Sequence, residues 1–431
     1  MSAQLSDYRL DGIYVQRQSG FFMQRVKLPA GVVSAGQARA IAAVAAHFGQ
    51  GTIHLTTRGS MEIHWLKEDD LAQVKRELAK AGLTSRGACG GAVRGITCGS
   101  QGVQGFPVLE SLARRLHRHF TGNPRFERLP KKFKIGLEAD SASGRHLIQD
   151  VGLVMAKNEG GQSCYDIWVA GGLGREPRPG FLLFKQVTEE RIIPIIEAIL
   201  TVYAAHAPPP KRLKFLASEF GEAKLRQLIE TEDCFGDKIP PVSGLTDNLI
   251  TEADGRQRLE LPVFAGRLTA EQLTTIAAAA DTYADGVLMV TSDQDIAMLL
   301  LAGVDAVVQR NTLQLLTGLA SYGFTNGLRV CPGSHECRMG LTATIDLAHE
   351  LVAQIGAQGR KLSWAVSGCS NSCTQPQLAD VGIMTARQSA DEDGQKAARF
   401  DVYRRIDTGL GQKVHIGLTK TELIEALQSI E

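Results

Sequence analysis

Two close pairs of cysteines near the C-terminus are the residues whose types and spacing most clearly predict chemistry. The first pair flanks the residues PGSHE and the second flanks SNS, and the four residues are Cys331, Cys337, Cys369 and Cys373. The stretch between the pairs has the pattern of a helix around 341–356 and a strand around 361–367. Each pair should therefore lie in a loop at the end of an element, so that two neighbouring loops present two thiolates each.

Four thiolates presented from loops suit either a four-cysteine zinc site or a [4Fe–4S] cluster. Structural zinc favours short C-x-x-C knuckles, whereas separations of five and three residues fit the larger cubane better. Four buried free cysteines are the alternative without any metal, because cysteine is a common core residue. The spacing favours the cluster over both alternatives.

The rest of the composition is that of an ordinary globular protein of 431 residues, with 44% hydrophobic and 22% charged residues. A net charge of +1 gives the whole chain no character of a nucleic-acid or membrane-surface binder. No signal peptide and no run approaching the roughly 18 apolar residues of a membrane span is apparent, so we expect a cytoplasmic location. The remaining cysteines are scattered, and the spacing of Cys89 and Cys98 does not support a second metal site.

The chain contains an internal repeat, in which residues 25–66 align with residues 260–301 at an offset of 235. Each copy predicts β-α-β-β-α, a ferredoxin-like half without its last strand. In each copy the first helix begins at a capping box, Ser34 with Gln37 or its counterpart Thr269 with Gln272. Arg58 of the first copy aligns with Asp293 of the second, so the function of Arg58 is no requirement of the shared fold.

A second, weaker repeat joins DVGL at 150–153 to DVGI at 380–383, and YDI at 165–167 to FDV at 400–402. The order of units is therefore A-B-A′-B′, which suggests two halves facing each other across a pseudo-twofold axis with a cleft between them. The proline-rich stretch 205–245 is expected to be a linker that holds one short helix. The predicted domains are 1–85, 86–235, 236–325 and 326–431.

The pattern C-x5-C followed by C-x3-C within SGC-x-N-x-C resembles the nitrite and sulfite reductase haemoprotein family, and within it the sulfite reductase haemoprotein component. The resemblance covers nearly the whole chain, because that family also has the A-B-A′-B′ duplication. It implies an α+β fold, internally duplicated, in which two ferredoxin-like half-domains alternate with two sirohaem- and cluster-binding α/β domains.

The resemblance also assigns roles to the cysteines. It implies that all four hold a [4Fe–4S] cluster and that Cys373 is in addition the axial ligand of a sirohaem iron. One shared sulfur gives a short electron path between the two cofactors. The chain has Ser370 and Ser372 where the family usually has proline and often has glycine. Neither departure removes a ligand, but both can alter the loop stiffness and the hydrogen bonds to sulfur that tune the potential.

Three basic segments extend the resemblance, namely HLTTRG from His54, GGAVRGIT from Gly90 and LPKKFK from Leu129. By that likeness the distal face of the haem is lined, the oxyanion bound and protons supplied by Arg58, Arg94, Lys132 and Lys134. Sirohaem carboxylates and small oxyanions both need such cations in a partly dry site. Strand alternation would place both lysines on one face with Phe133 opposite.

The alternative to a functional role for each of these cations is that it is an ordinary solvated charge on the surface. The family has glutamine where this chain has Gly59, and asparagines that this chain lacks around Arg94, which removes some polar contacts. As candidate ligands or acids, His54, His64 and His335 rank below the basic set, because a lone histidine on a strand is more often structural; His335, inside the cluster loop, is the most interesting of the three.

The activity implied by the resemblance is the six-electron reduction of sulfite to sulfide or of nitrite to ammonia. No flavin or nicotinamide segment is apparent, so a separate ferredoxin or flavoprotein would supply the electrons. We expect no nucleic-acid or membrane partner.

Three rival functions remain at this point: a precorrin-3B synthase-like tetrapyrrole oxygenase, a non-catalytic iron–sulfur electron carrier, and a dissimilatory subunit working beside a paralogue. The lysine pair Lys132 and Lys134 argues against the first two, since neither needs an oxyanion pocket. One chain with both halves and all four cysteines fits the third less well.

Overall fold

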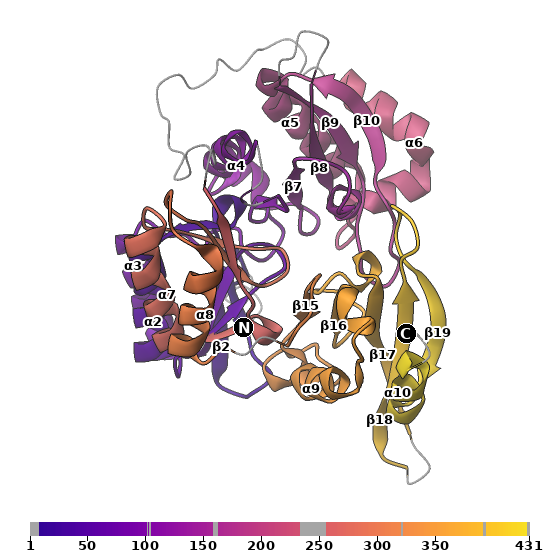
Figure 1. Cartoon of the computed structure of the whole chain (residues 1–431). Helices are drawn as coiled ribbons and strands as arrows, with labels where there is room; N and C mark the ends of the chain where they lie inside the picture. The colour runs from indigo at the N-terminus through magenta and orange to yellow at the C-terminus, as the bar shows by residue number, and fades with distance from the viewer. Residues whose placement is uncertain are drawn as a thin grey trace.

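The structure is a computed structural model, and it describes residues 8–100, 102, 105–157, 163–232, 256–319, 322–390 and 394–428. Three lobes surround a common centre (Figure 1). One lobe contains both ferredoxin-like copies, and each of the other two is built on one five-stranded sheet. None of the described helices is both long and apolar enough to span a lipid bilayer.

The first lobe is built from two copies of the predicted β-α-β-β-α order. The elements of the first copy are β1 (Ile13–Val15), β2 (Phe21–Val26), β3 (Val32–Ser34), α2 (Ala35–Phe48), β4 (Thr52–Leu55), β5 (Met61–Lys67) and α3 (Leu71–Lys80). Those of the second copy are β11 (Arg258–Leu261), β12 (Arg267–Thr269), α7 (Ala270–Tyr283), β13 (Val287–Val290), β14 (Ile296–Leu299) and α8 (Ala306–Thr317). Both predicted capping boxes are confirmed, at Ser34 and at Thr269.

The two copies exchange a short strand that sequence analysis did not predict. β3 of the first copy pairs with β13 of the second, and β12 of the second pairs with β4 of the first. The exchange gives the sheet orders β1-β2-β5-β4-β12 and β11-β14-β13-β3. Helices α2 and α7 share one apolar core, so the two copies form a single packed unit.

The other two lobes share one topology. The strands of the upper lobe are β6 (Thr97–Cys98), β7 (Ile135–Glu138), β8 (Val151–Lys157), β9 (Ser163–Val169) and β10 (Phe181–Val187), in the order β10-β9-β8-β7-β6. Those of the lower lobe are β15 (Leu328–Val330), β16 (Trp364–Ser367), β17 (Val381–Ala390), β18 (Lys396–Arg404) and β19 (Gln412–Leu418), in the order β15-β16-β17-β18-β19. In each sheet the three strands that come first in the chain, β6 to β8 or β15 to β17, are parallel to one another. The two that follow in the chain pair antiparallel to their neighbours.

The helices of these lobes correspond in chain order except for α6, which has no counterpart among the described residues of the lower lobe. The upper lobe contains α4 (Phe106–Phe120), α5 (Glu189–His206) and α6 (Leu213–Thr231), and the lower lobe contains α9 (Thr344–Gln354) and α10 (Lys420–Gln428). Equivalent aspartates precede β8 and β17: a carboxylate oxygen of Asp150 accepts the Lys134 N–H at 2.9 Å, and one of Asp380 accepts the Ser363 N–H at 2.8 Å. The weaker repeat predicted from the DVGL and DVGI segments is therefore a structural repeat.

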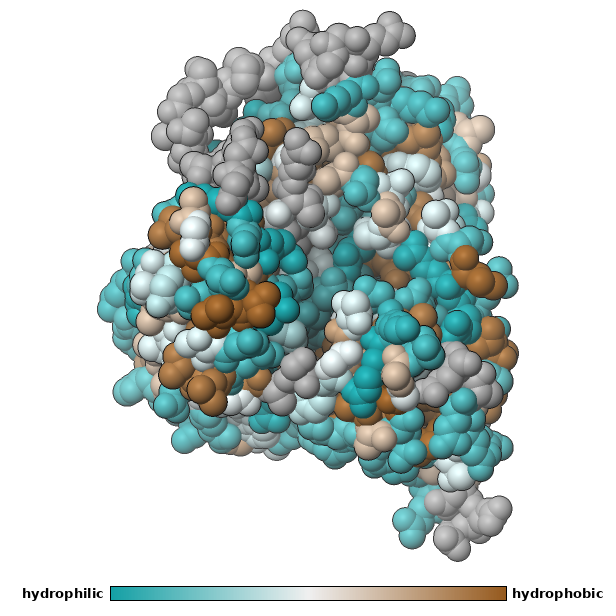
Figure 2. All heavy atoms as spheres, in the orientation of Figure 1, coloured by the Kyte–Doolittle hydropathy of each residue, from teal (hydrophilic) through white to brown (hydrophobic). Residues whose placement is uncertain are grey.

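The surface is hollowed between the lobe that carries α8 and the lobe that carries α9 (Figure 2). A cleft of about 780 Å³ in this region is lined by residues of α8, by 262–264 and by 322–328. The division of the chain at residues 85, 235 and 325 into domains stays a prediction.

The prediction that 205–245 is a linker with one short helix was wrong for its first half. α6 spans 19 residues with a kink at Gly221, where φ is +76°, and its apolar side packs against α5 in the core of the upper lobe. Leu216, Leu225 and Ile229 are fully buried there. Proline-rich composition suggested a linker, but the apolar spacing of the helix decides its burial. The second half of the predicted linker, 233–255, lies outside the described residues.

Replacement of Leu225 by alanine tests this placement, with Leu315 as the matched control. Leu225 is 0% exposed and Leu315 on α8 is 85% exposed. Leu225→Ala should lower the free energy of unfolding by about 2–5 kcal/mol, because it opens a cavity in the core. Leu315→Ala should change it by less than about 0.5 kcal/mol. Equal urea midpoints for the two variants would show that α6 is not part of the core.

Candidate functional site

The two cysteine loops leave the same edge of the lower-lobe sheet. Cys331 follows β15 and Cys369 lies just beyond β16, and these strands are parallel neighbours, so their carboxyl ends meet. The Gly368 N–H donates to the Cys331 thiol sulfur at 3.1 Å, and the Leu341 N–H donates to the Gly368 carbonyl at 2.8 Å. The expectation that the loops are neighbours is confirmed.

Glycines allow these loops to pack tightly on the start of α9. Gly333 has a φ of +54°, and a Cβ there would lie 2.2 Å from the hydroxyl of Thr344. A Cβ on Gly340 would lie 2.3 Å from the Gly333 carbonyl carbon. Both distances are too short for any side chain, so the fold of the first cysteine loop requires glycine at these positions.

The thiols of the four cysteines form one electrostatic cluster. Burial, and then repulsion from the Cys373 thiolate, raises the pKa of Cys331 to about 12 and that of Cys337 to about 11. The same two causes raise the pKa of Cys369. Four thiols in this position need a cationic centre to be held as thiolates, and a [4Fe–4S] cluster supplies one.

No three His, Cys, Asp or Glu side chains of the described part of the chain are gathered tightly enough to hold one metal ion. Thiols around a cubane do not need to converge on one point, because each binds a different iron. The Cys373 side chain is exposed, whereas the other three are partly buried. Cys373 is therefore the cysteine that is accessible from the central space between the lobes.

Arg58 lies in the β4–β5 hairpin of the first ferredoxin-like copy. Its guanidinium donates to the Gln149 side-chain oxygen at 3.0 Å and to the Gly95 carbonyl at 2.8 Å, which directs it toward the upper lobe. Burial first, and then the positive charge of Arg94, lowers the pKa of Arg58 to about 9. The guanidinium is thus held among other cations and is partly buried.

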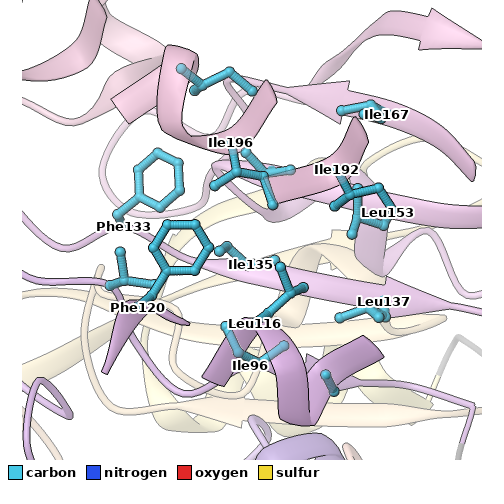
Figure 3. Close-up of a cluster of buried hydrophobic side chains, with 14 of the residues drawn as sticks. Ile96, Leu116, Phe120, Phe133, Ile135, Leu137, Leu153, Ile167, Ile192 and Ile196 are labelled. Atoms are coloured by element: carbon cyan, nitrogen blue, oxygen red, sulfur yellow. The ribbon is translucent and has the colours of Figure 1, made fainter. Parts of the chain in front are cut away.

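Lys132 and Lys134 lie in the extended segment that precedes β7, one to three residues before that strand begins. Phe133 points the other way, into the core beside Phe120 and Ile135 (Figure 3). The predicted alternation of faces is confirmed. No hydrogen bond or ion pair joins either lysine amine to the residues that the structure describes.

Electrostatics connects this lysine pair to the cysteines. Burial and Arg212 lower the pKa of Lys132 to about 8, whereas the Cys373 thiolate acts to raise it. Burial, Arg58 and Arg212 lower the pKa of Lys134 well below its usual value, against a smaller opposing effect of Asp150. The basic residues and the exposed cysteine therefore share one electrostatic environment.

Arg94 contributes to the site through its charge and through hydrogen bonds to the backbone. It is 7% exposed, and its two terminal nitrogens donate to the carbonyls of Ala88 and Gly90. Its Nε is buried without a partner among the described residues. Arg94 thus fixes the 88–90 turn and adds positive charge near Arg58, but its terminal nitrogens are already in use.

The site contains functional residues that sequence analysis missed. Arg212 is 9% exposed and pairs with Asp150 at 2.8 Å, while the Lys27 amine donates to the Thr121 hydroxyl at 2.8 Å. Burial and Arg94 lower the pKa of Lys27 to about 7. Arg212 follows the proline run in the segment taken as a linker, and the basic sequence KRLK there was the available signal.

One pair of hydrogen bonds joins the arginine hairpin to the second cysteine loop. The Thr57 hydroxyl donates to the Cys373 carbonyl at 2.7 Å, and the Gln375 amide donates to the Thr57 carbonyl at 3.3 Å. The hairpin that carries Arg58 therefore also fixes the backbone of Cys373. No sequence pattern relates residues so far apart in the chain in this way.

The histidines and the other cysteines lie outside this arrangement. His54 and His64 are buried on the sheet, where the His64 Nε2 lies 3.4 Å from a carboxylate oxygen of Glu62. His335 lies 3.4 Å from Asp346. Cys89 accepts a weak hydrogen bond from Arg25 at 3.8 Å.

The site therefore contains more positive charge than the neighbouring acid can neutralise, with Arg94 and Arg212 buried and Arg58, Lys132 and Lys134 partly buried. Asp150 already pairs with Arg212 and accepts the Lys134 N–H. Desolvated cations without partners are unfavourable, so the pocket is built to receive anions. The carboxylates of a sirohaem and a small oxyanion both satisfy this requirement, so the residues present fit that cofactor.

Two family models match the chain. The nitrite and sulphite reductase 4Fe-4S domain matches residues 97–234, and the nitrite/sulfite reductase ferredoxin-like half domain matches residues 14–81 and 251–307. The second match covers both copies of the first repeat.

Curated relatives cover nearly the whole chain. An assimilatory ferredoxin-dependent nitrite reductase of Haloferax mediterranei is 29% identical over 94% of this chain and 77% of its own length. A sulfite reductase [ferredoxin] of Mycobacterium tuberculosis is 25% identical over 94% of this chain and 81% of its own. Among solved structures, the Mycobacterium tuberculosis NirA protein matches with a TM-score of 0.83 at 23% identity, over 98% of this chain and 85% of that one. The last match supports the fold.

Replacement of Lys134 by methionine tests the excess of charge. In cofactor-free protein Lys134→Met should raise the free energy of unfolding by up to about 1 kcal/mol, because it removes a partly buried cation that is repelled by Arg58 and Arg212 and keeps a side chain of similar length. The exposed neighbour Lys131 is the control, and Lys131→Met should change stability by less than about 0.5 kcal/mol. Urea unfolding measures both. Destabilisation by Lys134→Met relative to Lys131→Met would contradict the description of the pocket as cationic and uncompensated.

Proposed function

Because the chain belongs to the nitrite and sulfite reductase haemoprotein family, we propose that it reduces sulfite to sulfide, or nitrite to ammonia, with sirohaem and a [4Fe–4S] cluster as cofactors. The observation that carries the proposal is the uncompensated cationic pocket beside Cys373. It is the arrangement that an oxyanion and a polycarboxylate cofactor require.

The residues that would hold the cofactors follow from the site. The cluster would be bound by Cys331, Cys337, Cys369 and Cys373. Cys373, as the exposed thiol of the set and one that interacts electrostatically with Lys132, would also ligate the haem iron. The haem carboxylates would be bound by Arg58, Lys132 and Lys134, while Arg94, whose terminal nitrogens donate to the carbonyls of Ala88 and Gly90, would contribute its positive charge. When bound, the cofactors supply the electrons and the iron on which the substrate is reduced.

The protein supplies charge and protons. Arg58 stays protonated and stabilises the negative charge of the bound anion. Lys132, with a pKa of about 8, and Lys134, with a lowered pKa, give up protons more readily than ordinary lysines. Each substrate oxygen that leaves as water must take up protons, and the lysine amines are placed to deliver them.

Electrons would come from a separate ferredoxin, as the names of the two curated relatives indicate for those proteins. Cys337 is followed by the exposed residues Arg338 and Met339. An exposed cation and an exposed apolar side chain next to a cluster ligand suit transient contact with an acidic donor. The cytoplasmic location stays a prediction.

The rival functions are not favoured. The curated relatives are named nitrite and sulfite reductases, which gives no support to a tetrapyrrole oxygenase or an electron carrier. A carrier that used only the cluster would have no need for desolvated lysines beside Cys373.

The absorption spectrum of the purified, cofactor-loaded protein tests the proposal. We expect a chlorin-like band in the red, together with reduction of sulfite or nitrite when reduced ferredoxin is supplied. Cys373→Ser should abolish magnetic coupling between haem and cluster. A loaded protein without the red band, or a Cys373→Ser variant with normal activity, would contradict the proposal. Steady-state rates with each anion separate the two substrates.

The pH dependence of turnover tests the role of Lys132. Its amine loses its proton as pH rises through about 8, or somewhat higher with the carboxylates bound. We expect kcat/KM for the anion to fall about tenfold per pH unit above that value. Lys132→Arg should remove this alkaline limb at some cost in kcat, because arginine keeps its charge but donates protons poorly. An unchanged limb in Lys132→Arg would assign the titration to another group, and the exposed Lys131→Arg is the control.

A further inference from the structure

The duplicated hairpin has the same backbone in both ferredoxin-like copies. In the first copy the Thr56 hydroxyl accepts the N–H groups of Arg58 and Ser60, at 3.3 and 3.2 Å. In the second copy the Thr291 hydroxyl accepts those of Asp293 and Asp295, at 3.2 and 3.1 Å. The two loops therefore differ in their side chains and not in their scaffold.

The side-chain difference reverses the charge. Where the first copy presents Arg58 to the anion pocket, the second presents Asp293 to two arginines. Asp293 lies 2.8 Å from Arg145 of the upper lobe and 2.7 Å from Arg329 of β15. Although burial acts to raise its pKa, the two arginines lower the pKa of Asp293 to about 2, so the carboxylate stays charged.

Arg329 links this carboxylate to the second cysteine loop. Its guanidinium is 3% exposed and donates through Nη1 to Asp293 and through Nε to the Thr374 carbonyl at 2.9 Å. Thr374 directly follows Cys373, whose own carbonyl is held by Thr57. The backbone at the exposed cysteine is thus anchored twice, by the first-copy hairpin and by the second.

The next residue, Gln294, anchors the first cysteine loop in the same way. Its side-chain oxygen accepts the Val330 N–H at 2.8 Å, one residue before Cys331. Its amide donates to the Leu55 carbonyl at 2.9 Å, in the first copy. Gln294 is 2% exposed, and its counterpart in the first copy is Gly59, which has no side chain to make such bonds.

We propose that Asp293, acting through Arg329, is a positioning residue that holds Cys373 in the geometry needed to connect the cluster to the haem. The proposal rests on the proposed function, because it concerns the residue assigned there to both cofactors. It gives the second hairpin a distinct role: both hairpins anchor the Cys373 backbone, the first also presents Arg58 to the anion, and the second also anchors the first cysteine loop through Gln294. The divergence of Arg58 and Asp293 after duplication follows from this division.

The test compares three variants of the cofactor-loaded enzyme by electron paramagnetic resonance of the haem–cluster exchange interaction. Asp293→Asn removes the charge that orients Arg329. We expect an altered exchange signature and a kcat lowered about tenfold or more, with KM for the anion unchanged. A role in stability alone would lower the melting temperature and leave the exchange signature as in the wild type.

Arg145→Gln is the matched control. It removes the other ion pair of Asp293 and leaves Arg329 bonded to both Asp293 and Thr374. We expect a lower melting temperature with an unchanged exchange signature. Equal changes of the exchange signature in Asp293→Asn and Arg145→Gln would overturn the positioning role. So would unchanged signatures in both variants with the cluster reduction potential shifted in opposite directions, because the effect would then be electrostatic.

Arg329→Lys keeps the test decisive if Asp293→Asn does not fold or does not take up its cofactors. Lysine retains the charge and the pair with Asp293 but lacks the forked donors that reach Thr374 at the same time. We expect the altered signature in this variant too, and a wild-type signature would overturn the proposal. A wild-type enzyme without the red band refutes the proposed function, whereas an active wild type with unaffected variants refutes only the positioning role.

Discussion

The excess of positive charge beside Cys373 is the constraint on which the rest of the structure depends. Lys132, Lys134 and Arg58 are partly buried and Arg212 is buried, while Asp150 is already paired with Arg212. Such a cluster destabilises the protein that contains it unless anions are bound. The surrounding fold has to hold these cations in place against their mutual repulsion, and it does so from the ferredoxin-like lobe, which carries Arg58, and the upper lobe, which carries the other three.

The duplication explains how three lobes can be held so firmly. The exchange of β3 and β12 joins the ferredoxin-like copies into one unit with one core. From that unit two hairpins with the same backbone project toward the centre, one to the upper lobe through Arg58 and Gln149, the other to the lower lobe through Asp293 and Arg329. Because the scaffold of both hairpins is fixed by a threonine hydroxyl, their side chains were able to diverge in charge without loss of the fold.

Much of the fold could be predicted from periodicity and capping. The helices after Ser34 and Thr269, the helix and strand between the cysteine pairs, and the repeated aspartates Asp150 and Asp380 follow from local signals. The exchanged strands β3 and β12 could not be predicted, because each has only three residues, carries no sequence pattern of its own and pairs with the other copy. A helix was predicted within 205–245, but its length and burial were not, because the proline-rich composition indicated a linker and only the tertiary structure shows that the apolar residues of α6 lie in the core.

By itself the sequence determined which residues are able to do the chemistry: four cysteines at cluster spacing, and Arg58, Arg94, Lys132 and Lys134 in recognisable segments. Only the tertiary structure decided how they are connected. It revealed the bond from Thr57 to Cys373, the electrostatic link of Lys132 to the same cysteine, and the contribution of Arg212. The physical reason is that thiol reactivity and lysine acidity depend on burial and on neighbouring charges, and these come from chain segments that are far apart in the sequence.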